Sequence, residues 1–297
     1  MRTSHRSQLR FALELVSPDE GETVAVEHEE DVDEVFAVAG FGTTRSHLPG
    51  LAGDVSRGAG RKWTVIKSGS MPAAVFTPAL QLQTLFELNA EGRIVSTREP
   101  NPSPGPAFAL VRSSIDCAWA IRADVPDELA GELDRLAREE GATSNSRDTP
   151  KHAERYLELL GGETECGPVF TFPNAFVEFS GLVAIEDVRL LEGNFHGWVS
   201  DEISGRSPIL AIVEDGKAVS ICFCARRSER GAEAGVETMT SFRARGLGTR
   251  VTAAWSLAIT ASGRMPIYST TWSNGASLGV ARKLGLIPCA TDWSVFS

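Results

Sequence analysis

Residues 231–261, which read GAEAGVETMTSFRARGLGTRVTAAWSLAITA, decide the fold class of this chain. The pattern predicts a β-strand over 232–240 and a long helix over 247–261, with the turn RARGLG at 243–248 between them. Glycine permits a close approach to the backbone, and the first amides of a helix have no acceptor within the helix. The positive end of the helix dipole and the charges of Arg243 and Arg245 favour an anion there. The turn therefore predicts a phosphate or pyrophosphate site.

A tight loop without a ligand is the alternative interpretation of this turn. Two nucleotide-binding motifs do not fit it. A dinucleotide fingerprint needs a third glycine at the start of a βαβ unit and an acidic residue about 20 positions later. Here the third glycine is absent, the turn lies late in the sequence, and an antiparallel hairpin is predicted before it. The lysine and hydroxyl pair of a Walker motif is absent as well.

The elements predicted around the turn indicate a mixed α+β fold, because antiparallel strands lead into a strand–helix–strand–helix series. Strands rich in β-branched residues on both sides of Gly216 predict a hairpin. Gly193 and Gly197 argue against the regularity of the helix predicted before that hairpin. The elements predicted in this part are strands at 169–173, 209–213, 218–225, 232–240, 267–272 and 292–296, and helices at 187–202, 247–261 and 276–284.

The first 165 residues predict two further regions. Residues 1–75 stay unassigned; they include an irregular glycine-rich stretch at 40–60 and a predicted strand at 63–66. Residues 76–165 predict an N-terminal α+β domain, and a third region, 166–297, contains the RARGLG turn. The elements predicted in 76–165 are helices at 78–84, 124–141 and 152–160, a hairpin over 85–97, a proline-rich connector at 99–106, and strands at 108–112 and 117–122.

Two motifs resemble those of the GNAT superfamily of N-acetyltransferases. The stretch from Arg243 to Gly248 resembles the motif (Arg/Gln)-x-x-Gly-x-(Gly/Ala). The stretch from Tyr268 to Leu286 is similar to the second motif, in which a strand is followed by Asn-x-x-(Ala/Ser) and a helix ends in Lys-Leu-Gly-Phe. The two motifs are about one helix and one strand apart, as in that superfamily. The resemblance covers residues 167–297 and implies a mainly antiparallel mixed sheet flanked by helices.

The resemblance also implies acetyl-CoA as the co-substrate, bound without a metal. The strand end around Thr238 would separate from its neighbour and offer backbone groups to the pantetheine arm. The turn would hold the pyrophosphate, and Asn274 and Ser277 would lie beside the pantetheine and the acyl group. The implied coenzyme-binding residues are Thr238, Met239, Thr240, Arg243, Ala244, Arg245, Gly246, Leu247, Gly248, Thr249, Asn274 and Ser277.

The chain departs from the superfamily pattern at the general acid. Many members carry a tyrosine seven positions after the Asn, and this chain has Ala281 there. Tyr268, Ser277 or water are the substitutes that we consider. A base is needed to deprotonate an ammonium substrate, and Glu237 is the preferred candidate, with a structural, hydrogen-bonded carboxylate as its alternative role. Glu233 lies four positions earlier on the same strand face, next to a polar turn, and we expect it to be solvated.

The composition limits the classes of partner that the chain can bind. The net charge of −10 and the pI of 5.1 argue against nucleic acid, which requires a basic face. No segment approaches the roughly 20 apolar residues that span a bilayer, and the N-terminus has no secretory pattern, so we expect a cytoplasmic protein. Cys222 and Cys224 are expected to be buried thiols, and the scattered histidines suggest no metal site. A small-molecule amine is the expected partner, and a homodimer is an alternative to a monomer.

Three functions are compatible with these features. The leading one is an acetyl-CoA-dependent N-acyltransferase that moves an acetyl group directly to an amine of a small molecule or peptide. The absence of a tyrosine at Ala281 keeps a non-catalytic acyl-CoA-binding or regulatory module as the alternative. Acyl transfer to a hydroxyl, or decarboxylation of an acyl thioester, is a third reading, because a fold does not fix a function.

Overall fold

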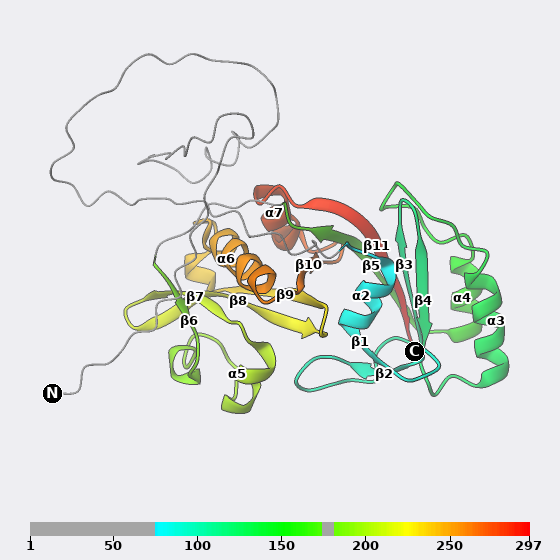
Figure 1. Ribbon diagram of the computed structural model, residues 1–297, viewed down its shortest axis with the longest axis horizontal. Helices are drawn as coiled ribbons and strands as arrows, with labels where there is room; N and C mark the ends of the chain where they lie inside the picture. The colour runs from blue at the N-terminus through cyan, green and yellow to red at the C-terminus, as the bar shows by residue number, and fades with distance from the viewer. Residues whose placement is uncertain (1–74, 174–180) are drawn as a thin grey trace, which may run out of the picture.

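The computed structural model describes residues 75–173 and 181–297, and most of its strands form one large mixed sheet (Figure 1). The nine strands of this sheet lie in the order β4-β3-β11-β5-β10-β9-β8-β7-β6. All neighbouring pairs are antiparallel except β9 and β10, which are parallel. The strands are β3 (Phe108–Ser113), β4 (Cys117–Ile121), β5 (Glu163–Thr171), β6 (Leu182–Ala184), β7 (Leu210–Glu214), β8 (Lys217–Arg227), β9 (Gly231–Thr238), β10 (Met265–Ser269) and β11 (Ile287–Phe296). The predicted fold class is thereby confirmed.

Local sequence signals account for the hairpins. Strands β1 (Phe86–Leu88) and β2 (Ile94–Thr97) form a separate two-stranded sheet. Its turn is closed by the Asn89 side chain, which accepts hydrogen bonds from the amides of Glu91 and Arg93. Between β7 and β8, Asp215 and Gly216 both have positive φ angles, 49° and 77°. Two such residues in succession match the twist of a tight hairpin, which explains why Asp-Gly stands there.

Helices cover both faces of the sheet. Helix α6 (Leu247–Ala261) packs on Cys222, Cys224 and Ala232, so both thiols are buried as the sequence predicts. The alternate residues of β8, Ile221 and Phe223, pack on the opposite face near α5 (Ser200–Arg206). The remaining helices are α2 (Pro78–Leu85), α3 (Asp127–Ala137), α4 (Ala153–Leu160) and α7 (Gly275–Lys283), with short 3-10 turns η1 (Val188–Leu190) and η2 (Thr240–Phe242).

The two faces of the N-terminal strands have separate hydrophobic cores. Phe108, Leu110 and Trp293 pack under α3 and α4, and Phe108 stacks on Tyr156 with ring centroids 4.5 Å apart. Ala109 and Val111, which alternate with them, pack under α2 instead. The boundary predicted between residues 165 and 166 falls inside β5, and β11 pairs with both β3 and β5. The 76–165 and 166–297 regions therefore share one sheet.

The prediction of a single helix over 187–202 is wrong. That stretch contains η1, several turns, and the first residues of α5. Gly193 and Gly197 adopt positive φ angles of 86° and 87°, which end regular helix at both positions. Leu191 and Phe195 are nevertheless buried, so the apolar spacing reflects burial in irregular backbone.

Other predictions differ from the structure at strand ends. Strand β5 begins at Glu163 rather than at 169, β11 begins at Ile287 rather than near 292, and β10 ends at Ser269 rather than at 272. The irregular stretch at 40–60 and the strand predicted at 63–66 lie outside the described residues. Within the described ranges, no helix is long and apolar enough to cross a bilayer.

Candidate functional site

The parallel strands β9 and β10 pair along only part of their length and then diverge. Their register joins Met265, Pro266 and Ile267 of β10 to residues 231–233 of β9. Among the described residues, β10 pairs beyond Ile267 only with β5, while β9 beyond Glu233 pairs only with β8. The backbone of β9 after Glu233 is therefore unpaired on its β10 side, as the resemblance implies for the strand end at 237–239.

The amide of Thr238 points into this opening. The Met239 amide donates to the Val219 carbonyl of β8 at 2.9 Å, and successive amides of a strand point to opposite sides. The amide of Thr238 therefore faces the β10 side and is a hydrogen-bond donor for a ligand group there. The Thr238 side chain points to the α6 face, where its hydroxyl lies 2.8 Å from the hydroxyl of Ser220.

The RARGLG turn forms a concave group of free amides at the start of α6. Ala244 and Gly246 have left-handed φ angles of 62° and 70°, and α6 begins at the next residue, Leu247. A non-glycine residue in this conformation is uncommon and concentrates at functional turns. The amides of Leu247, Gly248 and Thr249 make no backbone hydrogen bond among the described residues. Alternating backbone of this kind binds anions, so the turn fits a pyrophosphate.

Both arginines of the turn are oriented by contacts with the chain before it. The Arg243 Nε donates to the Thr238 carbonyl at 3.2 Å, which ties the turn to the end of β9. The Arg245 guanidinium lies 4.8 Å from the Phe242 ring centroid and donates to the Ser241 carbonyl at 3.3 Å. Both residues are exposed, so their remaining donors stay available to a phosphate.

The other predicted coenzyme contacts divide into exposed and buried positions. Asn274 is the N-cap of α7, and its Oδ1 accepts from the Ser277 amide at 3.0 Å. This bond gives Asn274 a structural role as a helix cap. The side chain of Thr249, in the first turn of α6, is buried, so only its amide is available to a ligand. Thr240 is exposed in η2, and Met239 packs partly against the α5 side of the sheet.

Tyr268 and Ser277 form a hydrogen-bonded pair beside Ala281. The Tyr268 hydroxyl lies 2.6 Å from the Ser277 Oγ and donates to its carbonyl at 3.2 Å. Tyr268 and Ala281 belong to the same buried cluster under α7. Burial raises the pKa of Tyr268 to about 12, and the hydrogen bond from Ser277 opposes that rise. The phenol is therefore protonated at neutral pH, and the small side chain of Ala281 leaves space for its ring.

Glu237 lies on the opposite face of β9 from the turn. Its side chain is accessible to solvent and makes no hydrogen bond or ion pair among the described residues. The protein packed around it raises the pKa of its carboxyl, and the positive charge of Arg206 opposes this shift. A carboxylate with a raised pKa and free oxygens is suited to accept a proton.

An aromatic surface continues from Glu237 along the same face. Gly235 has no side chain there, and a Cβ at that position would lie 2.5 Å from the ring of Phe223. The Trp198 ring meets Phe223 edge-on at 4.8 Å, and the Arg206 guanidinium lies 5.2 Å from the Phe223 ring centroid. An acceptor that approaches Glu237 from this side meets aromatic rings and one positive charge.

The expectation that Glu233 is solvated is wrong. Glu233 is 4% exposed, and its carboxylate pairs with Arg226 at 3.1 Å. Ser269, at the diverging end of β10, donates a short hydrogen bond to the other oxygen of Glu233. Arg226 also pairs with Glu99 from the proline-rich connector. The alternation of β9 places Glu233 and Glu237 on one face. Arg226 lies seven residues away across the β8–β9 turn, but Ser269 and Glu99 are remote in sequence and left no local signal.

Asp292 adds a second acidic group to this buried cluster. Its Oδ2 accepts a hydrogen bond from the Gln81 Nε2 at 3.1 Å, and the Gln81 Oε1 is buried with no hydrogen-bond partner in residues 75–173 and 181–297. Burial raises the pKa of Asp292 to about 7, and the negative charge of Glu233 adds to the rise. The hydrogen bond from Gln81 and the charge of Arg226 oppose it. The carboxyl of Asp292 thus exchanges its proton near neutral pH.

We expect Asp292→Asn to remove a pH dependence of stability. An unfolded Asp has a pKa of about 3.9, so between about pH 4 and pH 7 the folded protein keeps a proton that the unfolded chain has lost. The free energy of unfolding of the natural chain therefore falls as pH rises through this window. The difference in free energy of unfolding between Asp292→Asn and the natural chain should therefore shift by about 2–3 kcal/mol in favour of the variant from pH 5 to pH 8.

Urea unfolding of both proteins at the two pH values measures this difference. Asp127→Asn removes an exposed carboxylate and is the control. Its free energy of unfolding should change between pH 5 and pH 8 as that of the natural chain does. An equal effect of Asp292→Asn at pH 5 and pH 8 would contradict the proton exchange at Asp292.

The structural comparisons cover 44% to 73% of this chain, and the family comparison covers the segment of residues 210–294. This segment, which contains both sequence motifs, matches the family model described as GNAT acetyltransferase. A GNAT-family acetyltransferase structure from Novosphingobium aromaticivorans is 19% identical over 44% of this chain and 64% of that chain, with a TM-score of 0.38. A GCN5-related N-acetyltransferase-like protein from Streptococcus suis is 17% identical over 67% and 88%, with a TM-score of 0.37. A tandem GNAT protein from the clavulanic acid biosynthesis pathway is 13% identical over 73% and 93%, with a TM-score of 0.40. No curated protein matches the chain.

Proposed function

We propose that this chain, whose residues 210–294 identify a GNAT-type acetyltransferase module, is an acetyl-CoA-dependent N-acyltransferase. Its acceptor is an amine of a small molecule or a peptide. One observation carries the proposal: the diverging end of β9 joins an anion-binding turn on one face to the free carboxylate of Glu237 on the other. The coenzyme and the acceptor would thus approach the same strand end from opposite faces of the sheet.

The residues of the strand end and the turn suit the parts of acetyl-CoA. The free amides of Leu247, Gly248 and Thr249 would hold the pyrophosphate, with Arg243 and Arg245 at its rim. The unpaired backbone of β9 would bind the amide groups of the pantetheine arm. The Thr238 amide would stabilise the charge that develops on the thioester oxygen.

The chemistry requires one proton acceptor and one proton donor. Glu237 removes a proton from the ammonium, and the neutral amine attacks the thioester carbon, forming the C–N bond. The C–S bond then breaks, and the leaving thiolate takes a proton from the Tyr268 hydroxyl directly or through Ser277. The new amide nitrogen loses its second proton to water, and a proton from water restores the Tyr268 phenol. The geometry of this pair supports the proposed donor in the absence of a tyrosine at Ala281.

Glu233 is the competing base. Its hydrogen bond to Ser269 brings it to the β10 side of the opening, although its ion pair with Arg226 occupies one carboxylate oxygen. An oxygen that is paired with a cation is a weaker proton acceptor than the free carboxylate of Glu237.

A non-catalytic acyl-CoA-binding module is the second candidate, and Ala281 in place of the usual tyrosine favours it. Calorimetry with acetyl-CoA and a thiol-release assay across a panel of amines separate the two functions. Binding with turnover supports the acyltransferase. Binding without turnover above background favours the binding module, and absence of binding would contradict both.

We expect Tyr268→Phe to lower kcat by about 10- to 100-fold, since it removes the proton donor but keeps the ring in the core. The affinity for acetyl-CoA should not change. The measurement is steady-state kinetics of thiol release over a pH range, together with calorimetry.

Ser277→Ala tests the relay. It should lower kcat if the proton passes through the Ser277 hydroxyl and leave kcat unchanged if Tyr268 donates directly. A Tyr268→Phe variant with unaltered kcat would exclude Tyr268 as the donor and assign the proton to Ser277 or water.

A further inference from the structure

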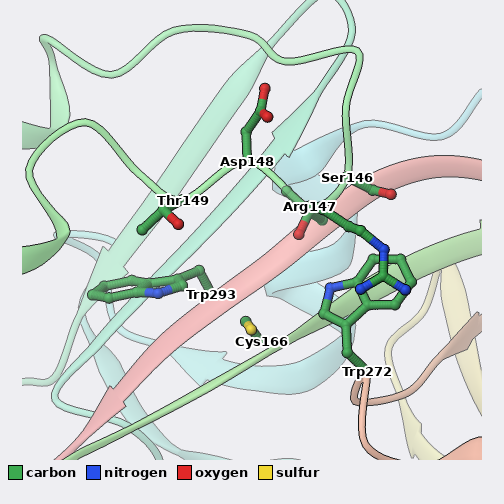
Figure 2. Close-up of a pocket in the computed structure, with 8 residues that line it drawn as sticks. Ser146, Arg147, Asp148, Thr149, Cys166, Trp272 and Trp293 are labelled. Atoms are coloured by element: carbon green, nitrogen blue, oxygen red, sulfur yellow. The ribbon is translucent and has the colours of Figure 1, made fainter.

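A cavity of about 140 Å³ lies on β5 and β11 (Figure 2). Its floor is formed by Cys166 and Trp293, which are cross-strand partners in the β5–β11 register. The loop that joins α3 and α4 covers it with residues 146–149. Trp272, from the segment after β10, forms the opposite wall, and its amide donates to the Cys166 carbonyl at 3.3 Å. The cavity therefore lies where the N-terminal elements meet the GNAT-type module.

Two indole rings give this cavity apolar walls. Figure 2 shows the Cys166 thiol between the rings of Trp272 and Trp293. A cavity of about 150 Å³ is large enough for a benzene ring. A flat apolar group of that size would contact both indoles and the thiol.

Arg147 gives the cavity a positive charge. Its guanidinium carbon lies 4.0 Å from the ring centroid of Trp272, so the cation stacks on the indole face. Arg147 forms no ion pair among the described residues. The neighbouring carboxylate of Asp148 accepts from Thr143 Oγ1 at 2.8 Å and from Asn145 Nδ2 at 2.6 Å, and it points away from Cys166. Arg147 is therefore the positive group of the cavity lining, and the hydrogen-bonded carboxylate of Asp148 is directed away from Cys166.

The covering loop is fixed by contacts with the core. The buried guanidinium of Arg112 donates a short hydrogen bond to the Asp148 carbonyl, and the Thr143 amide donates to the Ser113 carbonyl at 2.8 Å. The loop that carries Arg147 is thus ordered before a ligand binds. Ordering of a loop on binding costs free energy, and this loop avoids much of that cost.

We propose that this cavity, the Trp272–Trp293 pocket, binds a small aromatic carboxylic acid. The ring of the ligand lies between the two indoles above Cys166, and its carboxylate forms a bidentate ion pair with Arg147. The hydroxyls of Ser146 and Thr149, which line the same cavity, accept or donate hydrogen bonds at its rim. The pocket is separate from the anion-binding turn, and the inference does not rest on the proposed acyl transfer.

Cys166 supplies a readout that needs no activity. It is the exposed cysteine of the five, whereas Cys222 and Cys224 are buried and Cys117 and Cys289 are half-buried. Burial raises the pKa of Cys117 to about 11 and that of Cys289 to about 12, so neither thiol competes as a thiolate. The rate of Cys166 alkylation by N-ethylmaleimide, followed by peptide mass mapping, therefore reports occupancy of the pocket.

The full chain is labelled in the presence of benzoate, benzamide, inorganic phosphate or an acidic peptide. Benzoate should slow Cys166 alkylation by about tenfold or more at saturation, and benzamide, which lacks the charge, should not. Protection by the acidic peptide with none by benzoate would overturn the assignment to a small aromatic acid. Protection by inorganic phosphate with none by benzoate would show a site that binds anions without an aromatic ring. This result would also overturn the assignment.

Arg147→Gln should abolish the protection by benzoate, since it removes the charge from an exposed side chain that the core does not need. Arg138→Gln is the matched control, because Arg138 also lies over an indole, that of Trp119 at 5.9 Å, but outside the cavity. Equal protection of Arg147→Gln and Arg138→Gln by benzoate would overturn the inference. Calorimetric titration of the same variants with benzoate checks the result by a second method.

Discussion

The Glu237→Gln variant is expected to lose between about 10²- and 10⁴-fold in kcat/KM toward amine acceptors, with no change in the affinity for acetyl-CoA. The reason is that an ammonium must lose a proton before its nitrogen attacks a thioester. Glu237 has free carboxylate oxygens, a raised pKa and a position at the diverging end of β9. Glutamine keeps the size of the side chain and removes only its ability to accept a proton.

The pH profile of kcat/KM identifies Glu237 as the base. In the natural chain, activity should fall on the acidic side of the Glu237 pKa, because the protonated carboxyl accepts no proton, and the variant should lack this limb. Glu233→Gln is the companion variant, with a thermal unfolding scan to control for the loss of its ion pair with Arg226. A larger loss of activity in Glu233→Gln at equal stability would assign the base to Glu233 instead.

Gly167→Ala is expected to destabilise the protein by about 3 kcal/mol or more, because the new methyl group has no space. A Cβ at Gly167 would lie 1.8 Å from the Thr270 carbonyl oxygen, and backbone on both sides must move to accommodate it. The affected contact is that between β5 and the segment that follows β10. A loss of this size lowers the melting temperature by roughly 6–12 °C for a chain of this class.

Gly131→Ala provides the matched control for this substitution. Gly131 lies inside α3, and a Cβ there would meet no atom within 4 Å. Alanine is the better helix former by about 1 kcal/mol, so this variant should be slightly more stable than the natural chain. Thermal unfolding followed by circular dichroism measures both variants. A melting temperature of Gly167→Ala equal to that of the natural chain would contradict the close contact at Thr270.

The features that the sequence predicts well depend on neighbouring residues. The turn at 243–248, helix α6 and the β7–β8 hairpin each carry their signal within about ten residues, in glycine positions and apolar spacing. The family match at residues 210–294 covers these elements. The N-capping role of Asn274 is likewise local, since its partner is the amide three residues later.

The features that the sequence does not predict depend on contacts between distant residues. Burial of Glu233 involves Ser269 and Glu99, which are distant in sequence, in addition to Arg226, which lies seven residues away. The Trp272–Trp293 pocket needs the loop at 146–149 to lie over strands that come much later in the chain. The apolar spacing at 187–202 indicates burial correctly but not backbone conformation, because glycines at 193 and 197 permit turns that bury the same side chains without a regular helix.

The place of β11 between β3 and β5 has a consequence for the order in which the sheet forms. Its register joins Trp293 to Leu110 on one side and to Cys166 on the other, so each pairing closes a loop of more than a hundred residues. Loop closure over such separations is slow, and pairings of this kind lower the folding rate. Until β11 is in place, β3 and β5 each present an open edge of unpaired backbone groups. We therefore expect the aggregation-prone interval of folding to last until this strand inserts.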